Sequence, residues 1–378
     1  MCFNKRWILF FLFILVLTPV WGYTENTNGY LSVTGSCDLQ LPKDHASHSG
    51  YRTEWWYYTG NLKSALGKRY GFQLTFFRRR IIPSESEEKW PTPASAWRTG
   101  QIYLAHAAIS DLDGKHHFYA QDMGRSVLGI AGEYRDNDTI RIFVKKWSAR
   151  IGPKVHRLKV ISNPFSFDLN LTPVKPAAFH GKKGYSRKGS TPESASCYYS
   201  LTRLETKGQV TLSKKTVDVN GLSWMDHEFS TAPLEPGLVG WDWFGLQLSD
   251  NTELMIYLLR HEDGGFNPAS SGTYIRSNGK TKHLSGHDIE VTVTDTWNSP
   301  NSGAVYPARW RIRIPWPAMD LMITPNLADQ EMKTKESTGV TYWEGSVSVR
   351  GIKTGRRING QGYVELTGYA KAFDTPLY

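Results

Sequence analysis

The segment EWWYYTGNL, at Glu54–Leu62, decides the fold, because a related segment, GWDWFGLQL at Gly240–Leu248, returns in the second half of the chain. Each segment leads through a turn into an apolar run that ends in arginine, at Arg78 and at Arg260. In the alignment of the two segments, aromatic residues coincide at three positions. A repeat at this separation favours two related β-domains over a short-period solenoid.

The rest of the chain also has the pattern of a β protein. Its 378 residues suffice for two domains that each bury a core. Polar and apolar residues alternate with period two at 139–144 and 310–314, as in half-buried strands. Turn signals recur at short intervals, for example at Asp113-Gly114, Asn220-Gly221 and Asn359-Gly360. No long amphipathic helix is evident, and only short helical turns are expected, one of them near 328–335. Antiparallel barrels or sandwiches fit this pattern.

The least regular region runs from Asn163 to Ser196 and is rich in proline and glycine. We interpret it as the crossing between domains or as a loop over a pocket. The boundary is predicted close to residue 205, which gives an N-terminal domain at 23–204 and a C-terminal domain at 205–378. A second loop, Ile82–Thr99, is expected to cover one mouth of the first barrel.

Residues 1–22 have the pattern of a secretory signal peptide. Two basic residues precede an apolar stretch, Trp7–Val20, and a small residue, Gly22, offers a cleavage point. The stretch is shorter than the ~20 residues that span a bilayer. We predict an exported protein, periplasmic or secreted, with an uncleaved membrane anchor as the alternative.

The predicted mature chain contains two cysteines, Cys37 and Cys197. An oxidising compartment permits a disulfide between them, but two free thiols fit the sequence equally well. No Cys-x-x-Cys pattern occurs, so a cysteine zinc site is not supported.

The formal net charge of +10 admits two interpretations. Attraction to nucleic acid or to an anionic membrane surface is one of them. Basic side chains on solvated strand faces and loops are the other, and it is favoured because an exported protein does not meet nucleic acid. No nucleic-acid partner is predicted, and peripheral membrane contact is kept as an alternative.

The segment GLSWMDHEFS, at Gly221–Ser230, packs three ionisable groups between apolar residues. In a strand, Trp224, Asp226 and Glu228 point to one face, and the residues between them, His227 included, point to the other. A carboxyl group beside tryptophan can have a raised pKa and act as a general acid. The alternative is structural, with these carboxylates closing the junction between the domains through hydrogen bonds.

Each aromatic cluster also contains a carboxylate, Glu54 in the first and Asp242 in the second. A carboxylate among aromatic rings is costly to bury unless it is paired or has a function. Arg52, Arg78 or Arg260 could be structural partners, whereas a ligand pocket lined by tryptophan and tyrosine is the functional alternative.

Two other classes of site are weakly supported. His45 and His48, and also His283 and His287, have close spacing, but neither pair lies in a His-Glu-x-x-His pattern, so no metal site is predicted. No Gly-x-Ser-x-Gly elbow occurs, and Ser223 and Ser230 are only near His227 in sequence, so a serine hydrolase is not favoured.

The long motifs around these residues resemble the AttH-like family. They are Glu54–Leu62, His180–Gly189, Ser196–Ser200 and Ser223–Phe229, and the resemblance covers nearly all of the predicted mature chain. That family is similar to carotenoid 1,2-hydratases (hydroxyneurosporene synthases), and many members are labelled secreted hydrolases. The resemblance implies an all-β fold of two lipocalin-like antiparallel β-barrel domains packed together.

The resemblance also implies a chemistry and a set of residues. Carotenoid hydratases add water across an isoprenoid double bond without a cofactor, which needs an acid and a base. Asp226 would be the acid, His227 its partner or the base, and Trp224 a wall facing the cation. Glu54, His180 and Tyr185 are further candidates. The ligand-binding residues would include Trp55, Trp56, Tyr57, Trp241 and Trp243.

We therefore expect a lipophilic small-molecule ligand, isoprenoid or acyl, bound near the domain junction and hydrated or hydrolysed without a cofactor. A non-catalytic carrier of the lipocalin type is the alternative. The sequence carries no signal for a particular oligomeric state.

Overall fold

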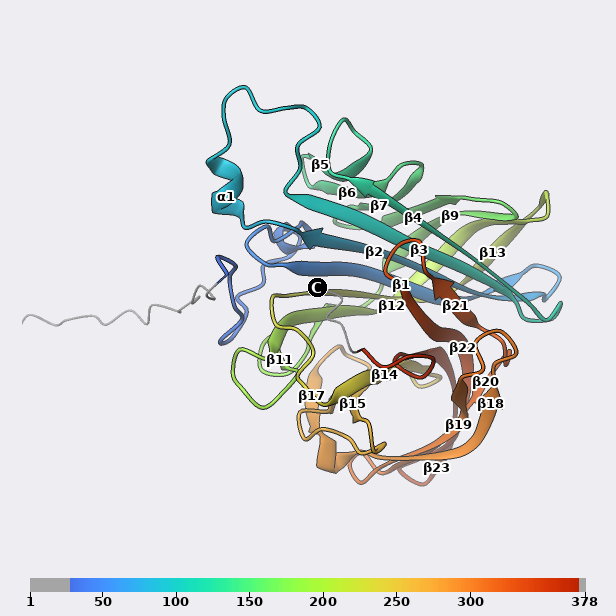
Figure 1. The fold of residues 1–378 in the computed structure, drawn as a ribbon. Helices are drawn as coiled ribbons and strands as arrows, with labels where there is room; N and C mark the ends of the chain where they lie inside the picture. Colours follow the sequence, from blue (N-terminus) through green and yellow to red (C-terminus); the bar gives the residue numbers. More distant parts are fainter. Residues whose placement is uncertain (1–27, 374–378) are drawn as a thin grey trace, which may run out of the picture.

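The computed structural model describes residues 28–373, so the predicted signal peptide at 1–22 lies outside the described residues. The chain forms two antiparallel sheets, each strongly curved (Figure 1). The strands of the first sheet are β1 (Thr53–Ser64), β2 (Arg69–Arg80), β3 (Gln101–Asp111), β4 (His116–Arg125), β5 (Ala131–Asp136), β6 (Thr139–Val144), β7 (Trp147–Ile151), β8 (His156–Ile161), β9 (Phe165–Pro173), β10 (Ala178–Phe179), β11 (Tyr185–Arg187), β12 (Ala195–Leu212) and β13 (Lys215–Ser230).

The second sheet is built from the remaining strands of the described chain. They are β14 (Leu238–Leu248), β15 (Glu253–His261), β16 (Ser271–Ile275), β17 (Thr281–Ser285), β18 (Glu290–Asn298), β19 (Val305–Ile314), β20 (Met319–Pro325), β21 (Glu331–Thr334), β22 (Val340–Lys353) and β23 (Arg356–Leu366). Within residues 28–373 the helices are short: α1 (Ser84–Glu88) and the 3-10 turns η1 (Lys43–His45) and η2 (Gly286–Asp288).

Both sheets share one topological rule, in which the first strand pairs with the last. Strand β1 lies between β2 and β13, and β14 lies between β15 and β23. The ends of the first sheet meet where β4 contacts β5, so this sheet is a nearly closed barrel, whereas the second curves as a half-barrel (Figure 1). The predicted all-β fold of two packed, lipocalin-like barrel units is confirmed.

The sequence repeat corresponds to the hairpins β1–β2 and β14–β15. In each hairpin the arginine at the end of the second strand binds the carboxylate of the aromatic cluster. Arg78 Nε donates to Glu54 at 2.8 Å, and Arg260 Nη1 donates to Asp242 at 2.6 Å. Two of the predicted arginine partners therefore form ion pairs, Arg78 with Glu54 and Arg260 with Asp242.

Alternation along β1 divides its aromatic side chains between two cores. Trp56 and Tyr58 point into the first barrel, where they join its apolar core. Tyr57 points outward into a third cluster, which lies between the two sheets and includes Trp224 and Trp243. The outer faces of the central strands thus pack the two units together.

The chain passes from the first sheet to the second at a later residue than predicted. The expected boundary between residues 204 and 205 falls inside β12, and the first sheet continues through β13 to Ser230. The irregular region Asn163–Ser196 does not cross between the units; it contains β10 and β11, which both pair with β12. The connection between the sheets is the short segment 231–237.

Three local expectations also change. Asn220-Gly221 and Asn359-Gly360 lie inside β13 and β23 and not at turns, and residues 331–334 form β21 instead of a helical turn. Gly221 is needed for close strand approach, since a Cβ there would lie 2.0 Å from the Asn61 carbonyl oxygen.

The predicted cover of the first barrel differs as well. Helix α1, within the loop Ile82–Thr99, buries no residue, whereas Ala46 of the N-terminal segment packs in the barrel core. That segment is held by a disulfide between Cys37 and Cys197, which decides between the two alternatives left open by the sequence. Over residues 28–373, no helix has the length and apolar character needed to cross a membrane.

Candidate functional site

Strand β13 carries two different polar clusters, one on each face. Asp226 and Trp224 face the second unit, whereas His227 and Met225 face into the first barrel, as strand alternation predicted. The predicted pairing of Asp226 with His227 is therefore wrong, because neighbouring residues of a strand point to opposite faces and these two side chains cannot meet.

Asp226 is the centre of the cluster at the junction. Tyr198 Oη donates to its Oδ2 at 2.8 Å, and Trp224 Nε1 donates to its Oδ1 at 2.6 Å. The Ser200 hydroxyl also donates to Oδ1. Strand pairing brings these groups together, since Ser200 of β12 lies directly opposite Asp226. The side chain is 4% exposed, so the carboxyl is held by protein donors and not by solvent.

A hydrogen-bonded chain extends from Asp226 into the second unit at both ends. On one side, His180 Nε2 lies 2.6 Å from Ser200 Oγ, and His180 Nδ1 lies 2.9 Å from Thr273 Oγ1. On the other side, Trp243 Nε1 donates to Tyr198 Oη at 3.0 Å. The predicted candidates His180 and Trp243 thus belong to the Asp226 cluster, and the cluster exists only where both units are present.

The order of this chain differs from that of a serine hydrolase. In a catalytic triad the carboxylate orients the histidine, which activates the serine. Here Ser200 lies between Asp226 and His180, and the second nitrogen of His180 meets a threonine hydroxyl. In this arrangement Asp226 is the acid–base group. Ser200 is not activated as in a triad, because no carboxylate orients the histidine beside it.

Burial raises the pKa of Asp226. Loss of hydration raises its pKa to about 7, against the lowering effect of Ser200, Trp224 and Tyr198, and the Glu228 charge adds to the rise. A carboxyl with this pKa can be protonated near neutral pH and still ionise, as a general acid requires. Glu228 in turn binds Lys188, whose Nζ lies 3.0 Å from its Oε1.

Aromatic rings surround the acid. Tyr57 and Trp224 both contact Trp243 edge to face, with ring centroids 5.2 and 6.0 Å apart. Trp55 and Trp241 pack against the same cluster but stay partly exposed, so they mark the edge where the junction meets solvent. The predicted ligand-binding residues Trp55, Tyr57, Trp241 and Trp243 therefore lie together.

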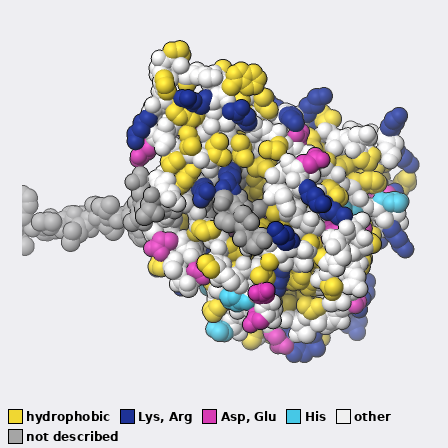
Figure 2. All heavy atoms as spheres, in the orientation of Figure 1, with side chains coloured by type: hydrophobic (Ala, Val, Ile, Leu, Met, Phe, Trp, Pro, Cys, Tyr) yellow, Lys and Arg dark blue, Asp and Glu magenta, His cyan; other side chains and the backbone are white. Residues whose placement is uncertain are grey.

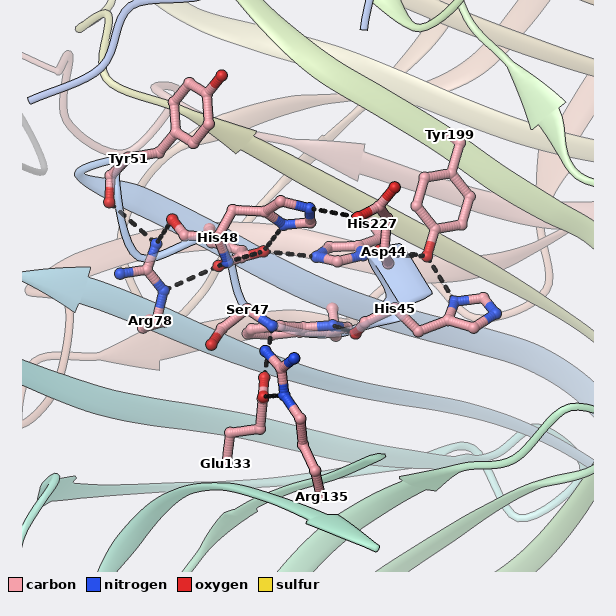
Figure 3. A network of polar contacts seen from close by, with 12 residues as sticks. Asp44, His45, Ser47, His48, Tyr51, Arg78, Glu133, Arg135, Tyr199 and His227 are labelled. Carbon is pink, nitrogen blue, oxygen red and sulfur yellow. Dashed lines mark hydrogen bonds and ion pairs between the residues drawn. The ribbon is translucent and has the colours of Figure 1, made fainter. Parts of the chain in front are cut away.

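The second cluster lies at one end of the first barrel and is centred on Glu54. Figure 3 shows its members His48, Arg78 and His227. His227 Nε2 and His48 Nδ1 each lie 2.8 Å from Glu54 Oε1, and Arg78 Nε donates to Oε2. Tyr199 Oη lies 3.0 Å from His227 Nδ1. Glu54 and Arg78 have no exposed surface.

This second cluster is an ion network that anchors the N-terminal segment, with Arg78 Nη1 as its one buried nitrogen without a hydrogen-bond partner among the described residues. Burial opposes the charge of Glu54, but the neighbouring Arg78 and His48 charges hold the pKa of Glu54 well below its usual range. Arg78 also donates to the carbonyls of His48 and Tyr51, and Trp56 Nε1 donates to the His45 carbonyl. Its contacts fasten residues 44–51 across the barrel end.

His48, Glu54 and His227 place metal-type donors within 4.8 Å of one another, the one such group found in the described chain. The charges do not favour a cation there. Arg78 neutralises Glu54, and His48, whose pKa is raised to about 9, is a cation balanced by Asp44 at 3.5 Å, so these ionised groups are neutral overall without a metal. A further divalent charge in this closed space would be strongly disfavoured.

The predicted site residues therefore divide into two groups and one outlier. The first group lies at the junction and consists of Trp55, Tyr57, His180, Trp224, Asp226, Trp241 and Trp243. Glu54, His227 and Trp56 lie in the inner cluster. Tyr185 is apart from both, since its hydroxyl donates to the Pro192 carbonyl. Sequence analysis assigned no function to Tyr198 or Ser200, although both lie in the motif Ser196–Ser200, which resembles the family.

Comparison with known proteins assigns the fold to a family. The family model described as AttH-like matches residues 32–369. A crystal structure from Nitrosomonas europaea, described as an AttH protein, is 31% identical, covers 89% of this chain and 99% of its own, and superposes with a TM-score of 0.78. No curated protein sequence matches the chain.

Two more distant structures share the fold alone. Kievitone hydratase from Nectria haematococca is 15% identical and covers 90% of this chain and 95% of its own, with a TM-score of 0.65. CghA, solved with Sch210972, is 12% identical and covers 92% of this chain and 98% of its own, with a TM-score of 0.53.

Proposed function

The chain belongs to the AttH-like family, and from this premise we propose that it adds water to, or removes water from, a lipophilic small molecule at the junction of its two barrel units. One observation carries the proposal: Asp226 is a buried carboxyl whose pKa is raised to about 7 inside a wall of tryptophan and tyrosine. The fold relative named as a hydratase supports this class of reaction.

The proposed reaction begins with proton transfer from Asp226 to one carbon of an isoprenoid-type double bond. The tertiary cation left on the other carbon lies against the faces of Trp224 and Trp243, which stabilise positive charge. The Asp226 carboxylate is stabilised as it forms by the donors Tyr198, Ser200 and Trp224. Water then attacks the cation and loses a proton, which gives the tertiary alcohol.

The edge of the junction supports a lipophilic substrate. Trp55 and Trp241 are partly exposed there, and Lys188 lies over the Tyr257 ring at 3.9 Å while it binds Glu228. Partly exposed tryptophan rings at the edge of the junction, with ionic groups beside them, suit an apolar chain that carries few polar atoms.

Replacement of Asp226 tests the proposal. With squalene and farnesol as alkene probes and mass spectrometry of the hydrated product, Asp226→Asn should lower kcat/KM by about 100-fold or more. Because the variant removes a carboxyl that is costly to ionise when buried, its Tm at about pH 8 should be equal or higher.

Asp242→Asn is the matched control, since Asp242 lies on the inner face of β14 and is bound by Arg260. It should lower stability, because Arg260 loses its partner, and should leave the turnover of folded protein unchanged. Full activity of Asp226→Asn on a probe that the wild type hydrates would refute the mechanism.

Binding without chemistry is the second candidate function, and one observation favours it. A hollow of about 550 Å³ opens at the end of the first barrel far from Asp226 along the strands, with Tyr70, Phe118, Leu212 and Val217 in its lining. A carrier would retain its lipid after purification. Mass spectrometry of an organic extract, with Asp226→Asn alongside, separates the cases: bound lipid with no turnover by the wild type favours the carrier.

We further propose that the protein is exported. The Cys37–Cys197 disulfide supports this, because such bonds persist in oxidising compartments. The mass of protein recovered from the exported fraction should correspond to a chain without residues 1–22. A full-length chain with free thiols, found only in the cytoplasm, would contradict export.

A further inference from the structure

A second pair of acidic side chains lies at the same junction, contributed by the second unit. Strands β22 and β23 pair so that Glu344 and Glu365 lie directly opposite each other. Like charges in this position repel, and a pair of this kind is most stable when the two carboxyls share one proton. Burial, followed by the charge of the other carboxyl, raises the pKa of Glu344, and burial raises that of Glu365 to about 7.

Two buried polar atoms at this pair lack a well-formed hydrogen bond. The Tyr57 hydroxyl lies within hydrogen-bonding reach of the Glu344 carboxyl, and this contact acts on the pKa of both groups. The contact is poorly aligned, so Tyr57 Oη and Glu344 Oε1 have no well-formed hydrogen bond within residues 28–373. Both side chains are almost fully buried, at 6% and 2% exposed. A donor and an acceptor that meet in poor alignment keep hydrogen-bonding capacity for a water molecule placed against both of them.

Tyr57 connects this pair to Asp226. On β1 it lies directly opposite Asp226 of β13, and its side chain faces the second unit, where β23 contacts β1 and β22 contacts β2. The charges of Glu344, Glu365 and Asp226 all act on the Tyr57 hydroxyl. The proton donor and the acidic pair therefore flank the same tyrosine.

The other groups that face the pair are few. Asp226 and Glu228 act on Glu365 from β13, and Trp241 lies beside it on β14. Tyr342 and Tyr363, the neighbours on β22 and β23, are affected by the charge of Glu344. Among the facing groups named here none is a cation, so the pair is not neutralised as Glu54 is by Arg78.

We propose that Glu344 and Glu365 form the second acid–base group of the site, which with Tyr57 holds the reacting water molecule and accepts its proton. This inference rests on the proposed hydration. Asp226 gives its proton to the alkene carbon and a C–H bond forms. The water oxygen bonds to the cation, and the proton released from that oxygen goes to the carboxyl pair. Solvent returns one proton from the pair to Asp226, so one water molecule is consumed per product.

The first measurement needs no substrate. In the Asp226→Asn background, which removes the other carboxyl of raised pKa, infrared titration of the full-length protein should show a protonated buried carboxyl at neutral pH. This signal should be lost when Glu344→Gln and Glu365→Gln are both added. Glu331→Gln is the matched control; this buried carboxylate accepts from Ser299 and Tyr306 inside the second unit and should leave the signal unchanged. An identical signal in all variants would overturn the shared proton.

The second measurement uses squalene and farnesol as probes. Glu344→Gln and Glu365→Gln should lower kcat about 100-fold with KM nearly unchanged and should remove one limb of the pH profile. A merely structural pair would change Tm and leave the pH profile in place. If the wild type is active, Asp226→Asn is inactive and both glutamine variants are fully active, this inference fails while the proposed function stands. If Asp226→Asn also stays active, the proposed function itself fails.

Discussion

Glu54 binds His48, His227 and Arg78 in a largely buried cluster, where His48 alone of the four is partly exposed. The charge of His48 therefore affects the stability of the fold. Burial disfavours the charged imidazole, but the Glu54 charge and the hydrogen bonds that the imidazole donates to Asp44 and Glu54 outweigh it and raise the pKa of His48 from 6.5 to about 9. A group with a raised folded-state pKa stabilises the fold fully below its unfolded pKa, and that contribution is lost as the pH rises through the folded value.

We therefore expect His48 to contribute roughly 3 kcal/mol below about pH 6.5 and almost nothing above about pH 9. His48→Gln should lower the free energy of unfolding at acidic and neutral pH and should flatten its alkaline decline. Urea denaturation at several pH values measures this. The exposed His116→Gln is the control, and the same pH dependence in both variants would show that the His48 charge is unimportant.

For individual residues, the sequence predicted the face of the strand to which a side chain points better than it predicted the side chain's hydrogen-bond partners. Period-two alternation correctly separated Trp224 and Asp226 from His227. It could not show that His180 and Ser200 meet Asp226, because that contact depends on the pairing of β12 with β13 and on the packing of two sheets. Glu344 and Glu365 were missed, although each is a lone carboxylate in an apolar strand, the same signal that pointed to Glu54.

Among the elements, the segment before β1 has too little regular structure to hold itself in place. The Cys37–Cys197 bond ties it to β12 across a sequence separation of 160 residues. A cross-link that closes so long a loop should stabilise the fold by about 3–5 kcal/mol. Cys37→Ser and reduction of the wild type should lower Tm to a similar degree, as measured by calorimetry.

Reduction of the Cys37→Ser variant supplies the control, because it should have no further effect. Its only other cysteine within 28–373 is Cys197, so no other bridge can form there. A Tm that does not change on reduction of the wild type would mean that the Glu54 cluster alone holds the segment.

Element boundaries were the weaker part of the sequence-based interpretation. Asn-Gly pairs favour turns, yet Gly221 lies within β13 because close strand contact demands a residue without a side chain. The proline-rich region Asn163–Ser196 was interpreted as a crossing between domains or as a loop over a pocket. Its short strands return to β12, so it is not the crossing. In both cases tertiary pairing outweighed a local signal, whereas the doubled aromatic hairpin correctly indicated two related units.

For the whole molecule, the junction should make the two units unfold together. Apolar packing is reinforced by Glu253, whose carboxylate lies 2.8 Å from Lys175 Nζ and 2.6 Å from Arg203 Nε of the first unit. Gln247 also donates to the Thr202 and Ser223 carbonyls. Far-ultraviolet dichroism and tryptophan fluorescence should therefore give coincident melting curves.

Glu253→Ala should lower the free energy of unfolding by about 3–5 kcal/mol, because it leaves buried cations without a partner. Two separate transitions in the wild-type protein would contradict a cooperative junction.

The basic side chains on the face drawn in Figure 2 do not form a single patch. On the face shown in Figure 2, Lys and Arg side chains are spread among hydrophobic and uncharged groups. Several exposed arginines are paired with carboxylates on neighbouring strands, such as Arg157 with Asp168 and Arg311 with Asp320. These paired basic residues lie on solvated strand faces.

The pairing of the first strand with the last also sets the order of folding. During synthesis β1 emerges early, with its Trp-Trp-Tyr-Tyr run, and one edge of it has no partner until β13 is complete at Ser230. Long-range pairing of this kind is slow, and an unpaired apolar edge promotes aggregation. A nascent chain halted before that residue would therefore be a client for chaperones, and Asp226 would gain its surroundings only in the last steps of assembly.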